Sequence, residues 1–139
     1  MIKKNKTIAT IVFGAIICCM LLGTIVSSAA ARNASVKVGT YCSVVGTYSQ
    51  AGAGKISARV TGKNMTSSSK YMVVYIQAYK QDGSLDKQNK VALNTAAGAE
   101  RLRTMDDIPS SDNVYGQTII YRGTSASTGI LESVRIIIN

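Results

Sequence analysis

Hydrophobic and polar residues alternate along several short stretches of the chain, most regularly at residues 55–61. There Ile56, Ala58 and Val60 fall on one side, and Lys, Ser, Arg and Thr residues fall on the other. This period of two is typical of a half-buried β-strand. Further strands are predicted at residues 71–79, 116–122 and 131–139, and less regular ones at residues 35–48 and 90–95. Gly and Ser clusters between these runs predict turns and loops.

Residues 95–109 do not show this alternation. Ala96, Ala99, Leu102 and Met105 fall at helical spacing, and Pro109 closes the segment. Glycine costs about 1 kcal/mol in a helix interior, and residue 98 is a glycine. The pattern therefore leaves two alternatives open, a short helix or an irregular crossover.

The composition beyond residue 31 favours strands over helices. This region contains 10 Val and 9 Ile but only 4 Leu, and all its aromatic residues are tyrosines. We therefore predict an all-β protein, a small antiparallel β-sandwich of immunoglobulin-like size with about six to seven strands. Residues 32–139 would form this single domain, preceded by an N-terminal signal helix.

The first 31 residues have the layout of a secretory signal peptide. Lysines at positions 3, 4 and 6 precede an uncharged stretch, residues 7–26, and the small residues 27–31 follow. The alternative is a retained membrane anchor, because about 20 apolar residues can cross a bilayer of about 30 Å. A lipid attachment site fits poorly, since Cys18 follows Ile17 and Cys19 follows Cys18. We expect a secreted or extracellular protein, either free or associated with the cell surface, that meets a membrane only through this segment if it is uncleaved.

The charge beyond the leader is moderately positive. Thirteen Lys and Arg residues exceed seven Asp and Glu by six, and the basic residues form no run. This scattered excess does not predict a nucleic-acid partner. It favours an anionic cell-wall polymer, a glycan or another protein. Only Cys42 remains after cleavage, so no intramolecular disulfide is expected, which is typical of a bacterial rather than a eukaryotic secreted domain.

Residues that perform catalysis are scarce. The chain has no histidine, and Cys42 is expected to be a buried small residue in the first strand. Glu100 and Glu132 are isolated in the sequence. Asp106, Asp107 and Asp112 form the one acidic cluster, in a loop whose spacing fits no EF-hand. We therefore predict a protein that is not an enzyme and that holds no cofactor or metal.

The stretch KYMVVYIQAYK, residues 70–80, is the strongest candidate for a binding surface. In a strand, three tyrosines and a glutamine share one face, lysines bound the segment, and the strand at residues 55–61 is expected alongside. Aromatic and cationic sheet faces hold sugars, peptides and acidic polymers. The alternative is that tyrosine fills a half-exposed sheet face. The predicted binding residues are Lys55, Arg59, Lys70, Tyr71, Tyr75, Gln77, Tyr79 and Lys80.

These observations favour an exported, non-enzymatic β-sandwich that acts by surface contact at the bacterial cell envelope, as a binding or structural module. The alternative is a diffusible secreted effector, such as a bacteriocin-like or inhibitor protein.

We predict that the exported protein begins between Ala30 and Asn33, because small residues precede this point as signal peptidases require. Intact-mass measurement on protein collected outside the cytoplasm checks this. A mass that includes Met1 or Ile2 would establish a retained anchor instead.

Overall fold

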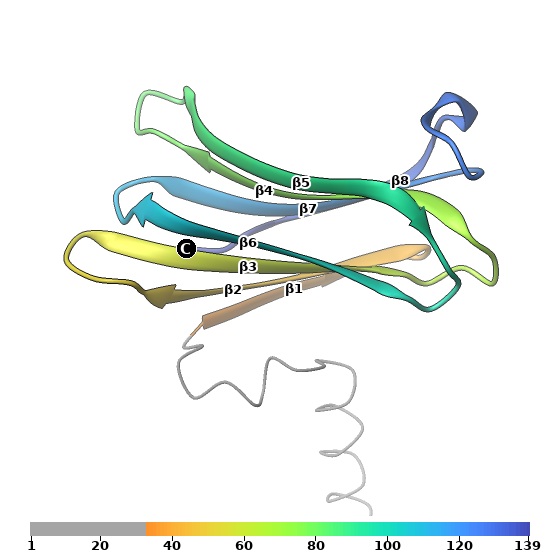
Figure 1. Ribbon diagram of the computed structural model, residues 1–139, viewed down its shortest axis with the longest axis horizontal. Coiled ribbons are helices and arrows are strands. Elements are labelled where there is room, and N and C mark those ends of the chain that lie inside the picture. The colour runs from red at the N-terminus through yellow and green to blue at the C-terminus, as the bar shows by residue number, and fades with distance from the viewer. Residues whose placement is uncertain (1–32) are drawn as a thin grey trace, which may run out of the picture. The chain divides into compact units, whose positions relative to one another are not determined.

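The structure is a computed structural model that describes residues 33–139, which form eight strands and one short 3₁₀ helix. In chain order these are β1 (Asn33–Val38), β2 (Cys42–Gln50), β3 (Lys55–Asn64), β4 (Lys70–Tyr79), β5 (Leu85–Thr95), β6 (Glu100–Pro109), β7 (Asn113–Tyr121), η2 (Ala126–Thr128) and β8 (Ile130–Ile137). The strands form two sheets, with the orders β1-β2-β3-β6 and β5-β4-β7-β8, which lie face to face (Figure 1). Every pairing within them is antiparallel.

The predicted all-β antiparallel sandwich is confirmed. The described residues hold eight strands where the sequence predicted about six to seven, because residues 35–48 divide into β1 and β2 and because β6 is an additional strand. The signal helix predicted before the domain lies outside the described residues.

The segment at residues 95–109 is neither a helix nor, along most of its length, a crossover. Residues 96–99 carry the chain from one sheet to the other, and residues 100–109 are strand β6. The helical spacing was misleading because, of its four residues, Met105 alone is buried, whereas Leu102 is 44% exposed. Met105 and Ile108 both face the core although they lie three positions apart. A bulge next to Asp107, whose φ is 54°, inserts an extra residue between them.

The core consists of the inward side chains of both sheets. Burying each such aliphatic side chain contributes roughly 1.5–3 kcal/mol. In β4 the register predicted from the sequence is confirmed, since Met72, Val74, Ile76 and Ala78 are all fully buried. The largest fully buried apolar side chains are Ile56, Met72, Ile76, Ile108, Ile120, Val44, Val60, Val74 and Val114.

Two glycines allow the sheets to approach closely across this core. A Cβ at Gly116 of β7 would lie 2.9 Å from a methyl group of Val60 in β3. A Cβ at Gly62 of β3 would overlap Val74 and Thr118 of the opposite sheet. Alanine at either position would therefore force neighbouring side chains apart.

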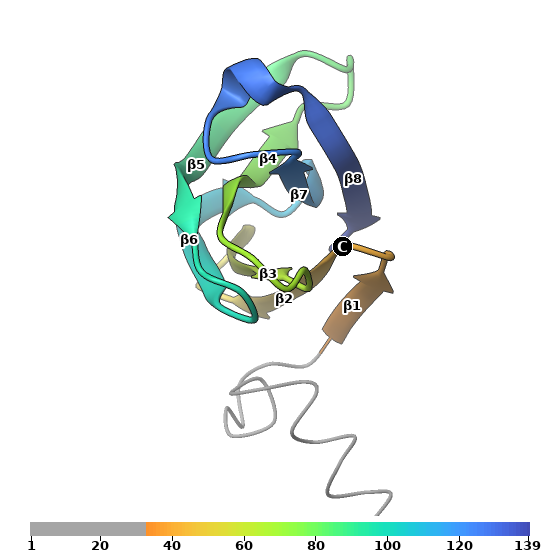
Figure 2. The same ribbon diagram turned by 90° about the vertical axis from the view of Figure 1, so that its right-hand side faces the viewer.

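Side chains bridge the two sheets along one open side, where edge strands β5 and β6 run together (Figure 2). The side-chain amide of Asn89 donates to the backbone carbonyl oxygen of Thr104 at 2.8 Å. The ammonium of Lys87 donates to the backbone carbonyl oxygen of Asp107 at 2.6 Å. Charged and amide groups in such positions satisfy edge backbone that would otherwise be free to pair with another chain.

A carboxylate closes the opposite side, where β8 runs beside the β1–β2 hairpin (Figure 2). Both carboxylate oxygens of Glu132 accept backbone N–H bonds, from Thr40 at 2.9 Å, Tyr41 at 2.7 Å and Cys42 at 2.8 Å. A Cβ at Gly39 would lie 2.6 Å from the carboxyl carbon, so any larger residue there would displace the carboxylate from its present position. Glu132 looked isolated in the sequence, but in the structure it has partners, because the turn from β1 to β2 folds around its side chain.

The three backbone donors decide the ionisation of Glu132. Burial disfavours its charged form, but the N–H groups of Thr40, Tyr41 and Cys42 outweigh this and lower its pKa. The interaction therefore stabilises the fold above the unfolded pKa of about 4.3 and is lost as the pH falls through the folded value.

We predict that Glu132→Gln lowers the free energy of unfolding by about 1–3 kcal/mol at pH 7, because an amide replaces charge-assisted acceptors. The difference from wild type should shrink as the pH falls below 4, where the wild-type carboxylate gains its proton. Urea titrations at pH 7 and pH 3 check this, with the exposed variant Glu100→Gln as the control. A difference of equal size at pH 3 and pH 7 would contradict the role of the charge.

Candidate functional site

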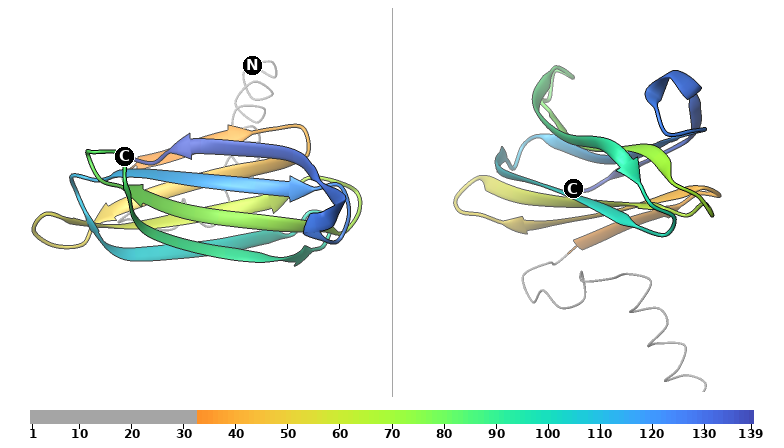
Figure 3. Two further views of the ribbon diagram at one scale, coloured as in Figure 1. Left: turned by 90° about the horizontal axis from the view of Figure 1, so that it is seen from above. Right: turned by 45° about the vertical axis from the view of Figure 1, so that its right-hand side comes forward.

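The outer surface of the β5-β4-β7-β8 sheet gathers most of the tyrosines of the described chain. Figure 3 (left) looks down on this sheet. The registers place Tyr71, Tyr75 and Tyr79 of β4 on the same surface as Tyr115 and Tyr121 of β7. We call this surface the tyrosine face. Its outward strand residues are Leu85, Gln88, Lys90, Ala92 and Asn94 of β5, Tyr71, Val73, Tyr75, Gln77 and Tyr79 of β4, Asn113, Tyr115, Gln117, Ile119 and Tyr121 of β7, and Ile130, Ser133, Arg135 and Ile137 of β8.

The structure brings four of the predicted binding residues together and separates two others from them. Tyr71, Tyr75, Gln77 and Tyr79 lie side by side on the tyrosine face. Lys55 and Arg59 belong to β3, which lies in the opposite sheet, so the expectation that they flank the tyrosines is wrong. Strand β3 precedes β4 in the chain but does not pair with it, because the loop between them, residues 65–69, crosses from one sheet to the other.

The two lysines that bound β4 occupy its ends rather than its outer face. The ammonium of Lys70 donates to the carbonyl oxygen of Arg122, in the loop after β7. The ammonium of Lys80 lies 3.7 Å from a carboxylate oxygen of Asp86. Both cations are therefore partly engaged by the protein itself.

Ring pairs and cations organise the tyrosine face. Tyr71 packs edge-on against Tyr121, with ring centroids 5.2 Å apart, and Tyr79 packs edge-on against Tyr115 at 5.7 Å. The guanidinium of Arg135 lies 4.1 Å from the centroid of Tyr115 and 5.8 Å from that of Tyr79.

A second cation lies farther along the same face. The ammonium of Lys90 sits 5.9 Å from the centroid of Tyr75. Between the rings, Gln77 and Gln88 are joined by a 2.9 Å hydrogen bond. Such ring–ring and ring–cation contacts fix aromatic side chains in place without hiding them from a ligand.

Sequence reasoning missed Tyr115, Tyr121, Lys90 and Arg135. The alternation did contain part of the signal, because Tyr115 and Tyr121 share a parity in β7, but the predicted strand began one residue after Tyr115. Lys90 and Arg135 could not be assigned, since alternation does not reveal which strands lie next to β4.

The sign of the charge on the tyrosine face is uniform. Its outward strand positions, as defined above, include Lys90 and Arg135 but no Asp or Glu. Within residues 33–139 the one ion pair is that of Lys80 with Asp86, at the end of the sheet. The face therefore offers cations whose charge no carboxylate of the described chain neutralises.

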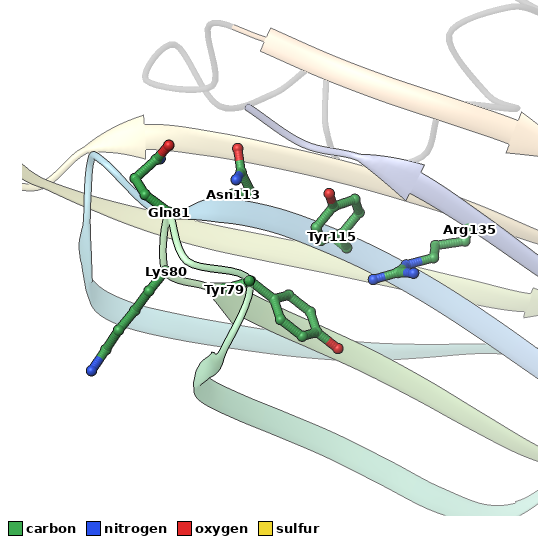
Figure 4. Close-up of a pocket in the computed structure, with 7 residues that line it drawn as sticks. Tyr79, Lys80, Gln81, Asn113, Tyr115 and Arg135 are labelled. Atoms are coloured by element: carbon green, nitrogen blue, oxygen red, sulfur yellow. The ribbon is translucent and has the colours of Figure 1, made fainter.

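A shallow pocket of about 190 Å³ opens at one end of the tyrosine face. Figure 4 shows Arg135 extending from β8 toward the rings of Tyr115 and Tyr79, while the Lys80 side chain points away from them. The pocket is lined by Tyr79, Lys80, Gln81, Gly83, Asn113, Tyr115 and Arg135.

The tight turn from β4 to β5 forms one wall of this pocket. A carboxylate oxygen of Asp82 accepts bonds from the backbone N–H of Ser84 at 2.9 Å and from its hydroxyl at 2.6 Å. The hydrogen bonds from the Ser84 hydroxyl and from the Ser84 backbone N–H together lower the pKa of Asp82. Gly83 between them has a φ of 84°, which favours glycine. Local turn chemistry therefore fixes where Lys80 and Gln81 stand.

The acidic cluster predicted from the sequence is divided in the structure. Asp106 and Asp107 are exposed on β6, whereas Asp112 in the β6–β7 turn is only 5% exposed. Burial, together with a hydrogen bond to Asp86 and the charge of that residue, raises the pKa of Asp112. The backbone of this turn is held by the side-chain amide of Asn139, which donates to the Asp112 carbonyl oxygen at 2.7 Å.

Cys42 is buried as expected, although it opens the second strand rather than lying in the first. Burial, followed by the charge of Glu132 and a side-chain hydrogen bond with it, raises the pKa of the thiol to about 12. A thiol with this pKa stays protonated at neutral pH and is a poor nucleophile.

Within residues 33–139, no three His, Cys, Asp or Glu side chains converge in a way that would hold a metal ion. In the same range there is no helix long and apolar enough to span a membrane.

Comparison with known proteins gives only distant likenesses. No protein-family profile matches the chain, and no curated protein matches it. Among solved structures it is similar to a Bacteroides uniformis β-glucuronidase, with 14% identity, a TM-score of 0.42 and coverage of 77% of this chain and 12% of the other. A calcium-binding mutant of Bacteroides uniformis β-glucuronidase 2 is 12% identical, with a TM-score of 0.39 and coverage of 76% of this chain and 12% of the other. A β-glucosidase from Streptomyces venezuelae is 19% identical, with a TM-score of 0.34 and coverage of 71% of this chain and 15% of the other.

The chain spans less than a sixth of the length of these enzymes. Likenesses at these TM-scores do not bear on what the protein does.

We predict that Asp112→Asn stabilises the protein at neutral pH. A carboxyl with a raised folded pKa contributes stability below its unfolded pKa of about 3.9, and this contribution is lost as the pH rises through the folded value. The amide avoids this loss and can still donate to Asp86. The melting temperature should rise by about 4 °C or more at pH 7, the shift that roughly 1 kcal/mol produces in a domain of this size, and the gain should vanish near pH 3.

Exposed Asp106→Asn is the control and should leave the melting temperature within about 1 °C of wild type at both pH values. A lower melting temperature for Asp112→Asn at pH 7 would show that the folded protein uses the Asp112 charge, against this prediction.

Proposed function

We propose that the protein is exported from a bacterial cell and acts without catalysis, by surface contact at the cell envelope. The tyrosine face is the contact surface of this binding or structural module. One observation carries the proposal: five tyrosines from two adjacent strands share an exposed sheet face with Lys90 and Arg135, and no carboxylate occupies its outward strand positions.

The arrangement of the rings suits binding. Tyrosine supplies a large, rigid contact area at a small cost in conformational entropy, and its hydroxyl group serves hydrogen bonding. All five side chains are half-buried, so each is held by its neighbours and still presents part of its ring to solvent. Val73, in the middle of the face, is only 4% exposed, which shows that larger side chains cover the sheet there.

The alternative that these tyrosines only cover the sheet explains part of the arrangement. Cross-strand aromatic pairs stabilise a sheet by roughly 0.2–1 kcal/mol each. This accounts for the pairs Tyr71–Tyr121 and Tyr79–Tyr115. It does not account for two cations placed against the rings with no opposing carboxylate.

The envelope location rests on the sequence of the leader and on charge. A signal peptide or anchor at residues 1–31 would bring the domain outside the cytoplasm, and the region beyond it has a net charge of about +6. Polymers of the bacterial wall, glycans and acidic proteins are the partners that such a cationic surface attracts.

We predict that the double variant Tyr75→Thr, Tyr79→Thr is released from washed cells while wild-type protein is retained. Both side chains point outward, so the fold should lose no more than about 1 kcal/mol for each substitution. Losing two rings should weaken the contact by about tenfold or more. Quantitative immunoblots of the cell-bound and medium fractions check this.

Tyr41→Thr is the matched control. Tyr41 is 42% exposed but lies in the β1–β2 turn, away from the tyrosine face. Retention of the double variant at the wild-type level would contradict the proposal. Wild-type protein found free in the medium, and slowing the growth of neighbouring strains, would instead establish a diffusible effector.

A further inference from the structure

Arg135 is the cation of the tyrosine face that is best placed to receive a ligand. It extends outward from β8 and stacks on Tyr115 at 4.1 Å, with Tyr79 beside it at 5.8 Å (Figure 4). It forms no ion pair and donates no side-chain hydrogen bond within residues 33–139. Stacking fixes the plane of a guanidinium and leaves the N–H groups on its edge free to bind a planar oxyanion through two parallel bonds.

The rest of the pocket is formed by tyrosine rings and polar residues, which are kinds of group that bind sugars. The rings of Tyr79 and Tyr115 stand at 80° to each other and form two walls. Asn113 and Gln81 also line the pocket, and the Gln81 side-chain amide donates to the carbonyl oxygen of Ser111. Apolar ring surfaces together with a few polar groups are typical of small-molecule sites.

The size of the pocket indicates one unit of a polymer rather than a whole small molecule. Its volume of about 190 Å³ is below the roughly 300–1,000 Å³ of enclosed ligand sites. The face continues beyond the pocket, and its registers align Arg135, Gln117, Tyr75 and Lys90 in one row across the four strands. A ligand polymer that crosses the sheet along this row would meet a cation at each end of the row. The two ends are three strand spacings apart, or about 14 Å.

We propose that this pocket binds an acidic polysaccharide, with Arg135 holding the carboxylate or phosphate of one unit. The ring walls contact the sugar, and Lys90 attracts a second anionic group farther along the chain. The inference rests on the proposed function, because it names the ligand class of the tyrosine face. Carboxylate and phosphate share the oxyanion geometry that a guanidinium fork recognises.

Binding of the purified exported protein to three polymers tests this inference. Polygalacturonate carries a carboxylate on each sugar, dextran phosphate carries phosphate groups on its glucose units, and dextran is neutral. Dissociation constants are measured by isothermal titration calorimetry at 50 and 200 mM NaCl. We expect at least one anionic polymer to bind at both salt concentrations and dextran to bind at least tenfold more weakly. Whichever anionic polymer binds more tightly identifies the source of the oxyanion.

Arg135→Gln should weaken binding of that polymer by about tenfold or more, because a charge-assisted pair is lost. Arg135→Lys should restore only part of the affinity, since a lysine offers a point charge without the planar fork. Arg59→Gln is the matched control: it removes the same charge from the outer surface of the opposite sheet and should change affinity by less than about threefold. Melting temperatures of the variants confirm that each is folded.

Equal losses for Arg135→Gln and Arg59→Gln would show unspecific attraction of a polyanion and would overturn the inference. So would dextran binding as tightly as the anionic polymers, or no binding by any of the three. Retention of the double tyrosine variant on cells distinguishes failure of this inference from failure of the proposed function. If the inference alone is wrong, the double tyrosine variant is still released from cells; if the proposed function is wrong, that variant stays bound.

Discussion

The burial of Met72, Val74 and Ile76 between the two sheets is the interaction on which the tyrosine face depends. A strand directs successive side chains to opposite surfaces, so each residue that enters the core sets its neighbour outside. In β4 this places Tyr75 between two anchored positions. The face is thus ordered by the core beneath it, and its rings need no further support from loops, which are usually the more mobile parts of a protein.

The sandwich holds its two sheets together without covalent cross-links among the described residues, whose one cysteine is the buried Cys42. Side-chain to backbone hydrogen bonds take that role along both open sides. Lys87 and Asn89 connect β5 to β6, and Glu132 connects β8 to the first hairpin. These bonds satisfy edge backbone groups and also make the closure on the Glu132 side depend on ionisation.

Most of the fold could be predicted from the sequence, because alternation is a local property of each strand. Residues 55–61 and 71–79 show it clearly and are strands with the predicted inward positions. Strand β6 was missed because Arg103 takes an inward position opposite Val60 while Leu102 is exposed, which inverts the expected pattern. A bulge at Asp107 also moves Ile108 out of alternation with Met105. Bulges depend on pairing with a partner strand, which a local pattern does not contain.

The candidate site was less predictable, because it is assembled from four strands whose order is not sequential. The tyrosines of β4 could be placed on one face, but the assumption that consecutive strands are neighbours put Lys55 and Arg59 beside them. The chain instead passes to the other sheet after β3, so the cations that stand there come from β5 and β8. Long-range topology, and not residue type, decided which charges meet the rings.

Strand β8 has a double role that follows from the positions of Glu132 and Arg135, three residues apart. The first points inward and grips a turn 92 residues earlier in the chain, and the second points outward over Tyr115. Strand β8 therefore both completes the sandwich and carries the arginine of the pocket. A chain in which β8 is not paired with β7 lacks the closure and the pocket together. Docking of this edge strand and assembly of the pocket are in this way one event.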